Sequence, residues 1–344
     1  MKKFLIKLSY TVLPIWLYVI GVLLYLNIYV KPQIGGDIGE LGIYALGTNY
    51  LDSLNNEALH TIYFKEINHE DELRDNLHQV LIVGDSFTVG QSNYGYVNYL
   101  AHFGLDITKF VLHKMIELNP CQIAYDLLNL GYVDSSNVQS MVVETVERDF
   151  VSRMTDFSVN EDSIKKIPFQ EVEQGMWKLS RVKDFFYYRL LGKNPTTIFT
   201  LDGNYFNHEN PERLYIYNND FKNFRIENDQ RDLIRQNMQT LFSKAKEKGV
   251  DLFFVVAGDK YDLYQSHIIN NKFPIKRINE DIKEIMGENN NIILTKDTLK
   301  SMIDQGVKDV YLYDDTHWSY KASKAVGELI FNRMKISGFI EKEK

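Results

Sequence analysis

One serine in the first half of the chain stands where a catalytic nucleophile could stand. Residues 80–90 read VLIVGDSFTVG, in which four apolar residues, typical of a buried strand, run directly into Gly-Asp-Ser. A plain turn accepts these three residue types readily. A serine is a weak nucleophile unless a base lies within hydrogen-bond reach and a further group orients that base. Whether Ser86 is a turn residue or a nucleophile therefore depends on what else the chain supplies.

A histidine near the C-terminus could supply that base. The chain has eight histidines, and His317 follows an Asp pair in the segment YDDTHW, just before a predicted helix. An Asp two or three residues before a histidine can turn its carboxylate onto the imidazole, fix its tautomer and stabilise the imidazolium. Asp314 and Asp315 both have this spacing, and the choice between them stays open. A helix N-cap and a metal site are the alternatives, although the sequence offers no third ligand of comparable placement.

These residues need a sheet to bring them together, and the pattern of the chain predicts one. Apolar runs predict central strands at 79–83, 140–150, 250–258 and 291–295. Helical patterns lie between and after them, at about 96–130 with breaks near Gly104 and Pro120, at 228–248, near 276–286 and at about 319–335. The alternation indicates an α/β fold with a parallel sheet covered on both faces. Ligands of such sheets bind beyond the carboxyl ends of the strands, where Ser86 is expected.

The middle of the chain departs from this alternation. Residues 152–225 hold many aromatic and asparagine residues without a clear period. We expect an insertion here, with short helices around 170–191 and hairpin-like strands near 197–206 and 213–221.

The N-terminus predicts a membrane anchor. An uncharged run from Leu8 to Val30 is long enough, at ~1.5 Å per residue, to cross a hydrocarbon core of ~30 Å. Three lysines precede the run and one follows it, which favours a cytoplasmic N-terminus and the rest of the chain outside. A cleavable signal peptide is the main alternative, but no Ala-x-Ala-like site follows the run. The predicted organisation is an anchor at 1–31, a lead-in at 32–78, and a catalytic domain at 79–344.

Composition excludes several other classes of protein. The chain has 344 residues with 44% hydrophobic residues, enough for a sizeable core. Its formal charge of −7 argues against nucleic acid as the main partner. A single cysteine, Cys121, allows neither an internal disulfide nor a thiolate metal cluster.

The motifs GDSFT and DDTHWS together resemble those of the SGNH (GDSL-like) hydrolase superfamily. Within it, the chain is similar to the branch that O-acetylates exported polysaccharides, including the alginate O-acetylation proteins. Three further stretches carry this resemblance: VVETVERDF, which ends near Glu147 and Arg148, VVAGDKYDLY, and the block around Thr316-His-Trp. The resemblance covers roughly 79–150 and 228–335. It implies a three-layer α/β/α, flavodoxin-like parallel sheet, with the anchor and the insertion added.

The resemblance also implies roles for individual residues. Ser86 would carry the acyl group, His317 would be the general base, and Asp315 or Asp314 would orient it. The Ser86 backbone N–H is one expected oxyanion donor. The superfamily's Gly-x-Asn-Asp block, which supplies a second donor, is not evident, and no residue is assigned to that role. The serine precedes the Asp-His block here, as in ordinary SGNH enzymes and unlike the alginate branch.

Five further residues are candidates for contact with the substrate. Arg148 and Lys260 follow predicted strands on the same side of the sheet as Ser86, and Trp318 could wall the site against water. The full candidate set is Asp85, Arg148, Lys260, Tyr261 and Trp318. For Arg148 the alternative is a buried ion pair with Glu147 that fixes the loop.

These observations predict a membrane-anchored enzyme on the extracytoplasmic side of the cytoplasmic membrane. The reaction expected is O-acetylation of an exported or cell-surface polysaccharide through an acyl-serine, with no metal or other cofactor. The resemblance implies that a membrane-embedded acyltransferase delivers the acyl donor. A carbohydrate acetylesterase would use the same triad with water as acceptor. A non-catalytic glycan-binding or assembly subunit is the alternative outside enzymes.

Overall fold

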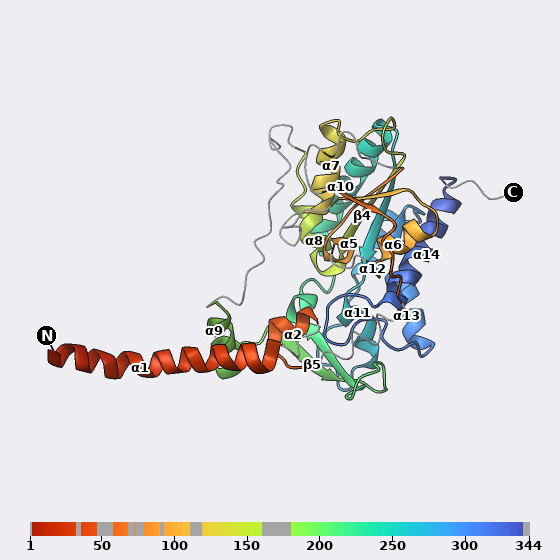
Figure 1. Cartoon of the computed structure of the whole chain (residues 1–344). Helices are drawn as coiled ribbons and strands as arrows, with labels where there is room; N and C mark the ends of the chain where they lie inside the picture. Colours follow the sequence, from red (N-terminus) through yellow and green to blue (C-terminus); the bar gives the residue numbers. More distant parts are fainter. Residues whose placement is uncertain are drawn as a thin grey trace.

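The computed structural model has an α/β architecture built on one six-stranded parallel sheet (Figure 1). The structure describes residues 2–31, 36–46, 58–67, 72, 79–89, 93–110, 119–159 and 180–339. The sheet consists of β1 (Lys65–Ile67), β2 (Val80–Val83), β3 (Ile107–Phe110), β4 (Ser140–Val146), β7 (Asp251–Ala257) and β8 (Ile292–Leu294). The strands lie in the order β1-β3-β2-β4-β7-β8, and every neighbouring pair is parallel.

The central strands are apolar on both faces because helices cover both. In β2, Val80 and Ile82 join one hydrophobic core, whereas Leu81 and Val83 join the other. The strands β4 and β7 alternate in the same way. This burial explains why their sequences are continuous apolar runs rather than alternating patterns, as is usual in parallel sheets.

Two groups of helices form the outer layers (Figure 1). One face of the sheet packs against α6 (Tyr96–His102), α13 (Lys296–Asp304) and α14 (Tyr320–Ile336). The other face packs against α7 (Pro120–Asn129), α8 (Glu147–Thr155), α10 (Asn228–Glu247) and α12 (Ile278–Met286). The short helices are α5 (Ser86–Val89), η4 (Asn218–Phe221), α11 (Lys260–Tyr264) and η5 (Gln265–His267).

The order of the strands indicates where a ligand of this type of sheet would bind. If the edge strand β1 is set aside, the other five strands have the order 2-1-3-4-5, which is the flavodoxin-like order. The chain direction across such a sheet reverses between its first and third strands, here β2 and β4. Ligands bind at this switch point, beyond the carboxyl ends of the strands. Ser86 follows β2 there, and Glu147 follows β4.

The segment between β4 and β7 contains the predicted hairpin. Strand β5 (Thr196–Thr200) pairs antiparallel with β6 (Arg213–Tyr217), and the two form a separate sheet. Leu214 and Ile216 of the hairpin join the core on the α14 face of the main sheet. The predicted helices at 170–191 appear as α9 (Ser180–Phe185) and the π-helix η3 (Phe186–Leu190). The earlier part of that prediction lies outside the described residues.

A long N-terminal helix projects away from the sheet (Figure 1). It comprises α1 (Lys2–Tyr25) and the π-helical continuation η1 (Leu26–Val30), and α2 (Asp37–Gly42) then lies against the body of the protein. The stretch Ile6–Val30 has 25 residues and a hydropathy of 2.0, so it is long and apolar enough to cross a membrane. A signal sequence has the same properties.

The sequence pattern did not predict the strands β1 and β3. Residues 96–130 are predicted as helices, but β3 lies between α6 and α7. Its short sequence ITKF places Lys109 in the middle of the strand, where the side chain is buried and pairs with Glu66 of β1 at 2.6 Å. Because this lysine interrupts the apolar run, the sequence pattern did not predict a strand here. The predicted strand at 140–150 was also too long, because Glu147 and Arg148 already belong to α8.

The glycine that ends β2 predicts a stability difference. A methyl group on Gly84 would meet the Glu144 carboxylate at 2.7 Å and the Thr88 Cβ at 2.8 Å. We expect Gly84→Ala to lower the free energy of unfolding by about 1–3 kcal/mol, because the tight packing must shift. Chemical denaturation of the purified protein measures this change.

Gly258→Ala is the matched control for Gly84→Ala. Gly258 follows β7 as Gly84 follows β2, but a methyl group there meets Lys296 at 3.6 Å, an ordinary contact. We expect a change of less than about 1 kcal/mol for this variant. Equal stability of the two variants would contradict the packing assigned to Gly84.

Candidate active site

Ser86 stands at the switch point of the sheet, as the first residue of α5. It is partly exposed, whereas its neighbours Asp85 and Phe87 are buried. The Phe87 N–H donates to the Asp85 carboxylate at 3.2 Å, and the Thr88 N–H donates to the Asp85 carbonyl at 3.0 Å. These bonds form a tight turn that presents the serine beyond the end of β2.

The Asp85 carboxylate faces into the protein and fixes this turn. It accepts hydrogen bonds from Arg153 at 2.6 Å and from the Val146 N–H at 2.8 Å. Burial opposes the charge of Asp85, but Arg153 outweighs burial and lowers the pKa of this carboxyl. Glu144 lies beneath the turn and accepts from the Asp85 N–H at 3.0 Å. Asp85, proposed from sequence as a substrate contact, thus joins the turn at the end of β2 to the start of α8.

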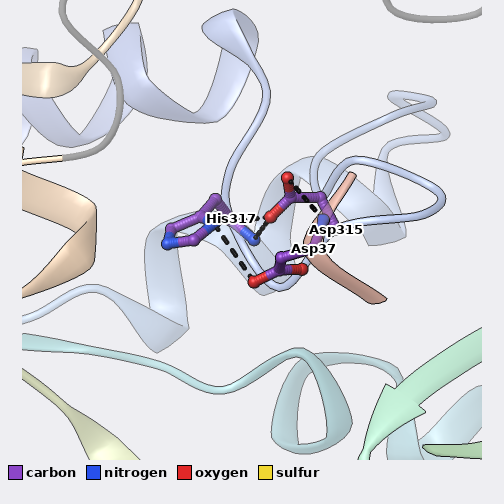
Figure 2. A group of neighbouring side chains, drawn as sticks. All are labelled: Asp37, Asp315 and His317. Atoms are coloured by element: carbon purple, nitrogen blue, oxygen red, sulfur yellow. Dashed lines mark hydrogen bonds and ion pairs between the residues drawn. The ribbon is translucent and has the colours of Figure 1, made fainter. Parts of the chain in front are cut away.

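His317 is held by the carboxylate of Asp315 (Figure 2). Its Nδ1 lies 2.5 Å from the Asp315 Oδ1, and its backbone N–H donates to the same oxygen at 2.9 Å. The Nε2 atom has no hydrogen-bond partner among the described residues. Figure 2 shows this nitrogen pointing away from the carboxylates. A carboxylate only accepts, so Nδ1 carries a proton, and in the neutral imidazole Nε2 presents the lone pair that a general base needs.

Asp314, the other candidate for orienting the histidine, does not contact the imidazole through a described hydrogen bond. Its side chain is buried, and none of its described contacts is a hydrogen bond or ion pair to His317. Burial and the charge of Asp315 raise the pKa of Asp314 to about 6. The contact geometry therefore favours Asp315 for the role that the sequence left open.

A second carboxylate reaches His317 from the start of the chain. The Asp37 Oδ2 lies 3.6 Å from the His317 Nδ1, on the same side of the ring as Asp315 (Figure 2). The Asp37 carboxylate accepts from the Thr316 N–H at 2.7 Å and from the Thr316 hydroxyl. The Asp37 N–H donates to the Asp315 Oδ2 at 3.3 Å. Asp37 thus contacts Asp315 and His317 as well as Thr316, which lies between them in the sequence.

Close packing of the backbone holds Asp37 in this position. The Gly39 N–H donates to the Asp314 carbonyl at 3.2 Å. A methyl group on Gly36 would lie 2.8 Å from the Asp315 Cβ, so only glycine permits this approach. Sequence analysis missed Asp37, because the contact spans 279 residues from Asp37 to Thr316. The glycines around it were the only signal, and they predicted a loop.

The two carboxylates determine the protonation of the imidazole. Burial lowers the pKa of His317, but Asp315 and Asp37 outweigh burial and raise it to about 9. The imidazole in turn keeps the pKa of Asp315 below its ordinary value, despite burial. Burial and Asp315 raise the pKa of Asp37 to about 7. Above pH 7 both carboxylates are ionised, and the pair stabilises an imidazolium as proton transfer from serine requires.

Aromatic packing connects the serine turn to the histidine. The ring of Phe87, next to Ser86, lies 5.0 Å from the His317 ring and 4.4 Å from the Trp318 ring, between centroids. Trp318, proposed from sequence as a substrate contact, is fully buried and packs against Phe87 and Tyr96. Among the described contacts there is no hydrogen bond between Ser86 and His317. Catalytic hydrogen bonds of this kind are often looser without substrate.

Lys260 and Tyr261 support the loop rather than reach into solvent. Both side chains are buried. The Lys260 ammonium donates to the carbonyls of Leu312, Tyr313 and Asp315, at 2.7, 2.9 and 3.1 Å. Burial lowers the pKa of Lys260 to about 8.

The Tyr261 hydroxyl donates to the Pro274 carbonyl at 2.9 Å. Both residues, proposed from sequence as substrate contacts, therefore have partners within the protein.

Arg148 has partners within the protein but is also partly open to solvent. Its guanidinium pairs with Asp220 at 3.3 Å and Asp259 at 3.4 Å, and it lies over the Tyr217 ring. The side chain retains 11% exposure. Its charge opposes protonation of His317, so it lies within electrostatic reach of the site. The buried partner expected for Arg148 was Glu147, but Glu147 instead accepts from the Asp259 N–H and from Asn279.

The same three side chains could be considered as metal ligands. One ligand atom each from Asp37, Asp315 and His317 lie within 4.8 Å of one another. The ring nitrogen beside both carboxylates is Nδ1, which already donates its proton to Asp315. A metal would need the lone pair of that nitrogen, and so would require the loss of this hydrogen bond. The arrangement therefore fits a carboxylate-held base better than a metal centre.

No family model, curated protein or solved structure matches this chain.

The position of Asp37 predicts a change in pH dependence. Asp37→Asn removes a negative charge that is present above pH 7, while an amide can still accept from Thr316. The pKa of His317 should fall from about 9 toward the ordinary 6.5. A general base acts only when neutral, so the rise of kcat/KM with pH should move to lower pH. Hydrolysis rates of an acetyl ester measured against pH test this expectation.

Glu40→Gln is the control for Asp37→Asn. Glu40 lies on the same helix, α2, but its carboxylate pairs with Arg181 rather than with His317. We expect its pH profile to match that of the unmodified chain. If the Asp37→Asn profile also matched, Asp37 would have no influence on the base.

Proposed function

We propose that this chain is a membrane-anchored, SGNH-type serine O-acyltransferase that modifies a polysaccharide outside the cytoplasmic membrane. The observation that carries the proposal is the state of His317. Its Nδ1 is bonded to a partly buried carboxylate, its Nε2 is without a partner among the described residues, and its ring packs against the residue next to Ser86. A serine, a histidine and an aspartate so arranged are the parts of a nucleophilic triad.

In the first half of the proposed reaction, the Nε2 of His317 removes the proton of the Ser86 hydroxyl. The serine oxygen attacks the carbonyl carbon of an acyl ester and forms a tetrahedral intermediate. The intermediate expels the donor alcohol, which receives the proton from the imidazolium. The product of this step is an acyl-serine.

In the second half, a sugar hydroxyl takes the place of the donor alcohol. The Nε2 of His317 removes its proton, and the sugar oxygen attacks the acyl-serine. Ser86 leaves as the alkoxide and regains the proton from the imidazolium, so the enzyme returns to its initial state. The Ser86 backbone N–H is a candidate donor to the oxyanion in both halves. No metal takes part in these steps.

The N-terminal helix supports the cellular location. The lysines at 2, 3 and 7 precede the uncharged run Leu8 to Val30 and Lys31 follows it, which favours a cytoplasmic N-terminus. The active site would then lie outside, close to the membrane, because Asp37 follows the span by only a few residues. Acetyl-CoA is not available there, so an acyl donor delivered by a membrane-embedded acyltransferase is the expected partner.

Acetyl transfer to sugar is the direct test of this function. Full-length protein in detergent micelles is incubated with a chromogenic acetyl ester, with and without oligosaccharide acceptors. We expect acetylated sugar, detected by mass spectrometry, with the unmodified chain. Ser86→Ala should lower the rate by on the order of 10⁴-fold or more, because the residues of a triad act as a unit.

Ser152→Ala provides the matched control, since Ser152 is an exposed serine of α8 whose hydroxyl donates to a carbonyl of its own helix. Its activity should equal that of the unmodified chain. Acetate release without acetylated sugar would favour the acetylesterase. Equal rates for Ser86→Ala and the unmodified chain would contradict the triad and favour a binding subunit.

A further inference from the structure

A second apolar segment packs beside the N-terminal helix, far from it in sequence (Figure 1). Val22, Leu26 and Val30 recur every four residues on one face of the N-terminal helix, and they form a small core with Val182 of α9 and Ile43. The rings of Phe185 and Tyr25 lie 5.8 Å apart. This core is separate from the two cores of the sheet.

The contacts set the depth of this segment along the N-terminal helix. The Phe186 ring lies 6.5 Å from the ring of Tyr18, which is at the middle of the stretch Ile6–Val30. If that stretch crosses the bilayer, α9 and η3 lie at the level of the outer leaflet. Their backbone is helical throughout, so the N–H and C=O groups in the interior of the segment pair with one another, which suits a membrane.

The outward side chains of this segment suit a lipid surface. Large apolar residues of the segment are exposed, with fractions of 41% for Phe186, 58% for Leu190 and 51% for Leu191. An exposed cluster of this kind usually marks a binding surface. Tyrosine is also favoured at membrane interfaces, and Tyr187 is 37% exposed.

Basic residues surround these apolar side chains. The stretch 181–193 contains Arg181, Lys183, Arg189 and Lys193 but only one acidic residue, Asp184, in a chain of net charge −7. Lys183 and Lys193 both lie over the Tyr187 ring. Lysines beside an aromatic and apolar face are typical of helices that bind the headgroups of anionic lipids.

We propose that α9 and η3 form a second membrane-binding element, which inserts its apolar face into the outer leaflet beside the anchor. Arg181 pairs with Glu40, and Arg189 donates to the Ile43 carbonyl at 2.6 Å. These bonds attach the element to α2, whose first residue is Asp37. Lipid binding would therefore fix the height and tilt of the active site above the membrane. The inference rests on the membrane anchor of the proposed function but not on its chemistry.

Site-specific fluorescence in vesicles tests this inference. The native Cys121 is fully buried, and burial raises the pKa of its thiol to about 12, so a maleimide dye should spare it. Leu190→Cys carries the dye in the full-length chain, reconstituted in phosphatidylcholine vesicles with and without phosphatidylglycerol. Lipids with a spin label on the acyl chain should quench this dye. Added phosphatidylglycerol should increase the quenching.

Dyes at two further positions serve as controls, one inside the anchor and one far from the membrane. Ile15→Cys lies within the anchor and is 60% exposed. Ile336→Cys, 64% exposed, lies at the end of α14 on the far side of the body (Figure 1). We expect the dye at Leu190 to be quenched about as strongly as at Ile15, and several-fold more than at Ile336.

The outcomes are distinct. Quenching at Ile15 but not at Leu190 would overturn the inference and leave the anchor intact. Protection of Leu190 only in native membranes would assign the face to a protein partner and would also overturn it. Absence of quenching at both positions would overturn the anchor and the inference together.

Discussion

A partly buried imidazole with two carboxylates on one side is held by several neighbouring elements, and the constraint that these contacts impose organises the structure around His317. Asp315 and Asp37 hold the Nδ1 side of the ring. Lys260 holds three carbonyls of the loop that carries Asp315. The Phe87 ring packs against the rings of His317 and Trp318. Such a site is preorganised, because the protein has already oriented the groups that a reaction would need.

The same constraint connects the site to the sheet. The turn that carries Ser86 is fixed by Asp85, Arg153 and Glu144, all buried between the ends of β2 and β4. Loss of one partner would leave a buried charge without compensation, which is a costly change. The ionic groups near the switch point therefore hold the serine turn and the first turn of α8 in one arrangement.

Much of this architecture could be predicted from the sequence. The continuous apolar runs of β2, β4, β7 and β8 identified the central strands, and the prediction of a parallel sheet covered on both faces is confirmed. Strands β1 and β3 were missed because β1 has three residues and β3 contains the buried Lys109. Local periodicity cannot reveal a strand whose central residue is charged and satisfied only by a neighbouring strand.

The candidate site was predictable only where its contacts are local in the sequence. The Asp315 to His317 contact is local, so spacing alone suggested it. Asp37 is brought to the same imidazole from the other end of the chain, and no spacing rule reaches that far. Asp85, Lys260 and Tyr261 show a different limit, because their polar atoms have partners within the protein while substrate contact stays a prediction. Sequence marks such residues as candidates at strand ends but does not show whether their polar atoms face a ligand or the protein.

The reactivity of Ser86 tests the central claim most directly. Full-length protein is treated with a fluorophosphonate, which forms a stable adduct only with an activated nucleophile, and the modified peptide is identified by mass spectrometry. The account predicts one adduct, on Ser86, formed on the order of 10²–10⁴-fold more slowly in Asp315→Asn. Asp314→Asn should retain most of the labelling rate. Absence of any adduct, or an adduct on another serine, would contradict the account.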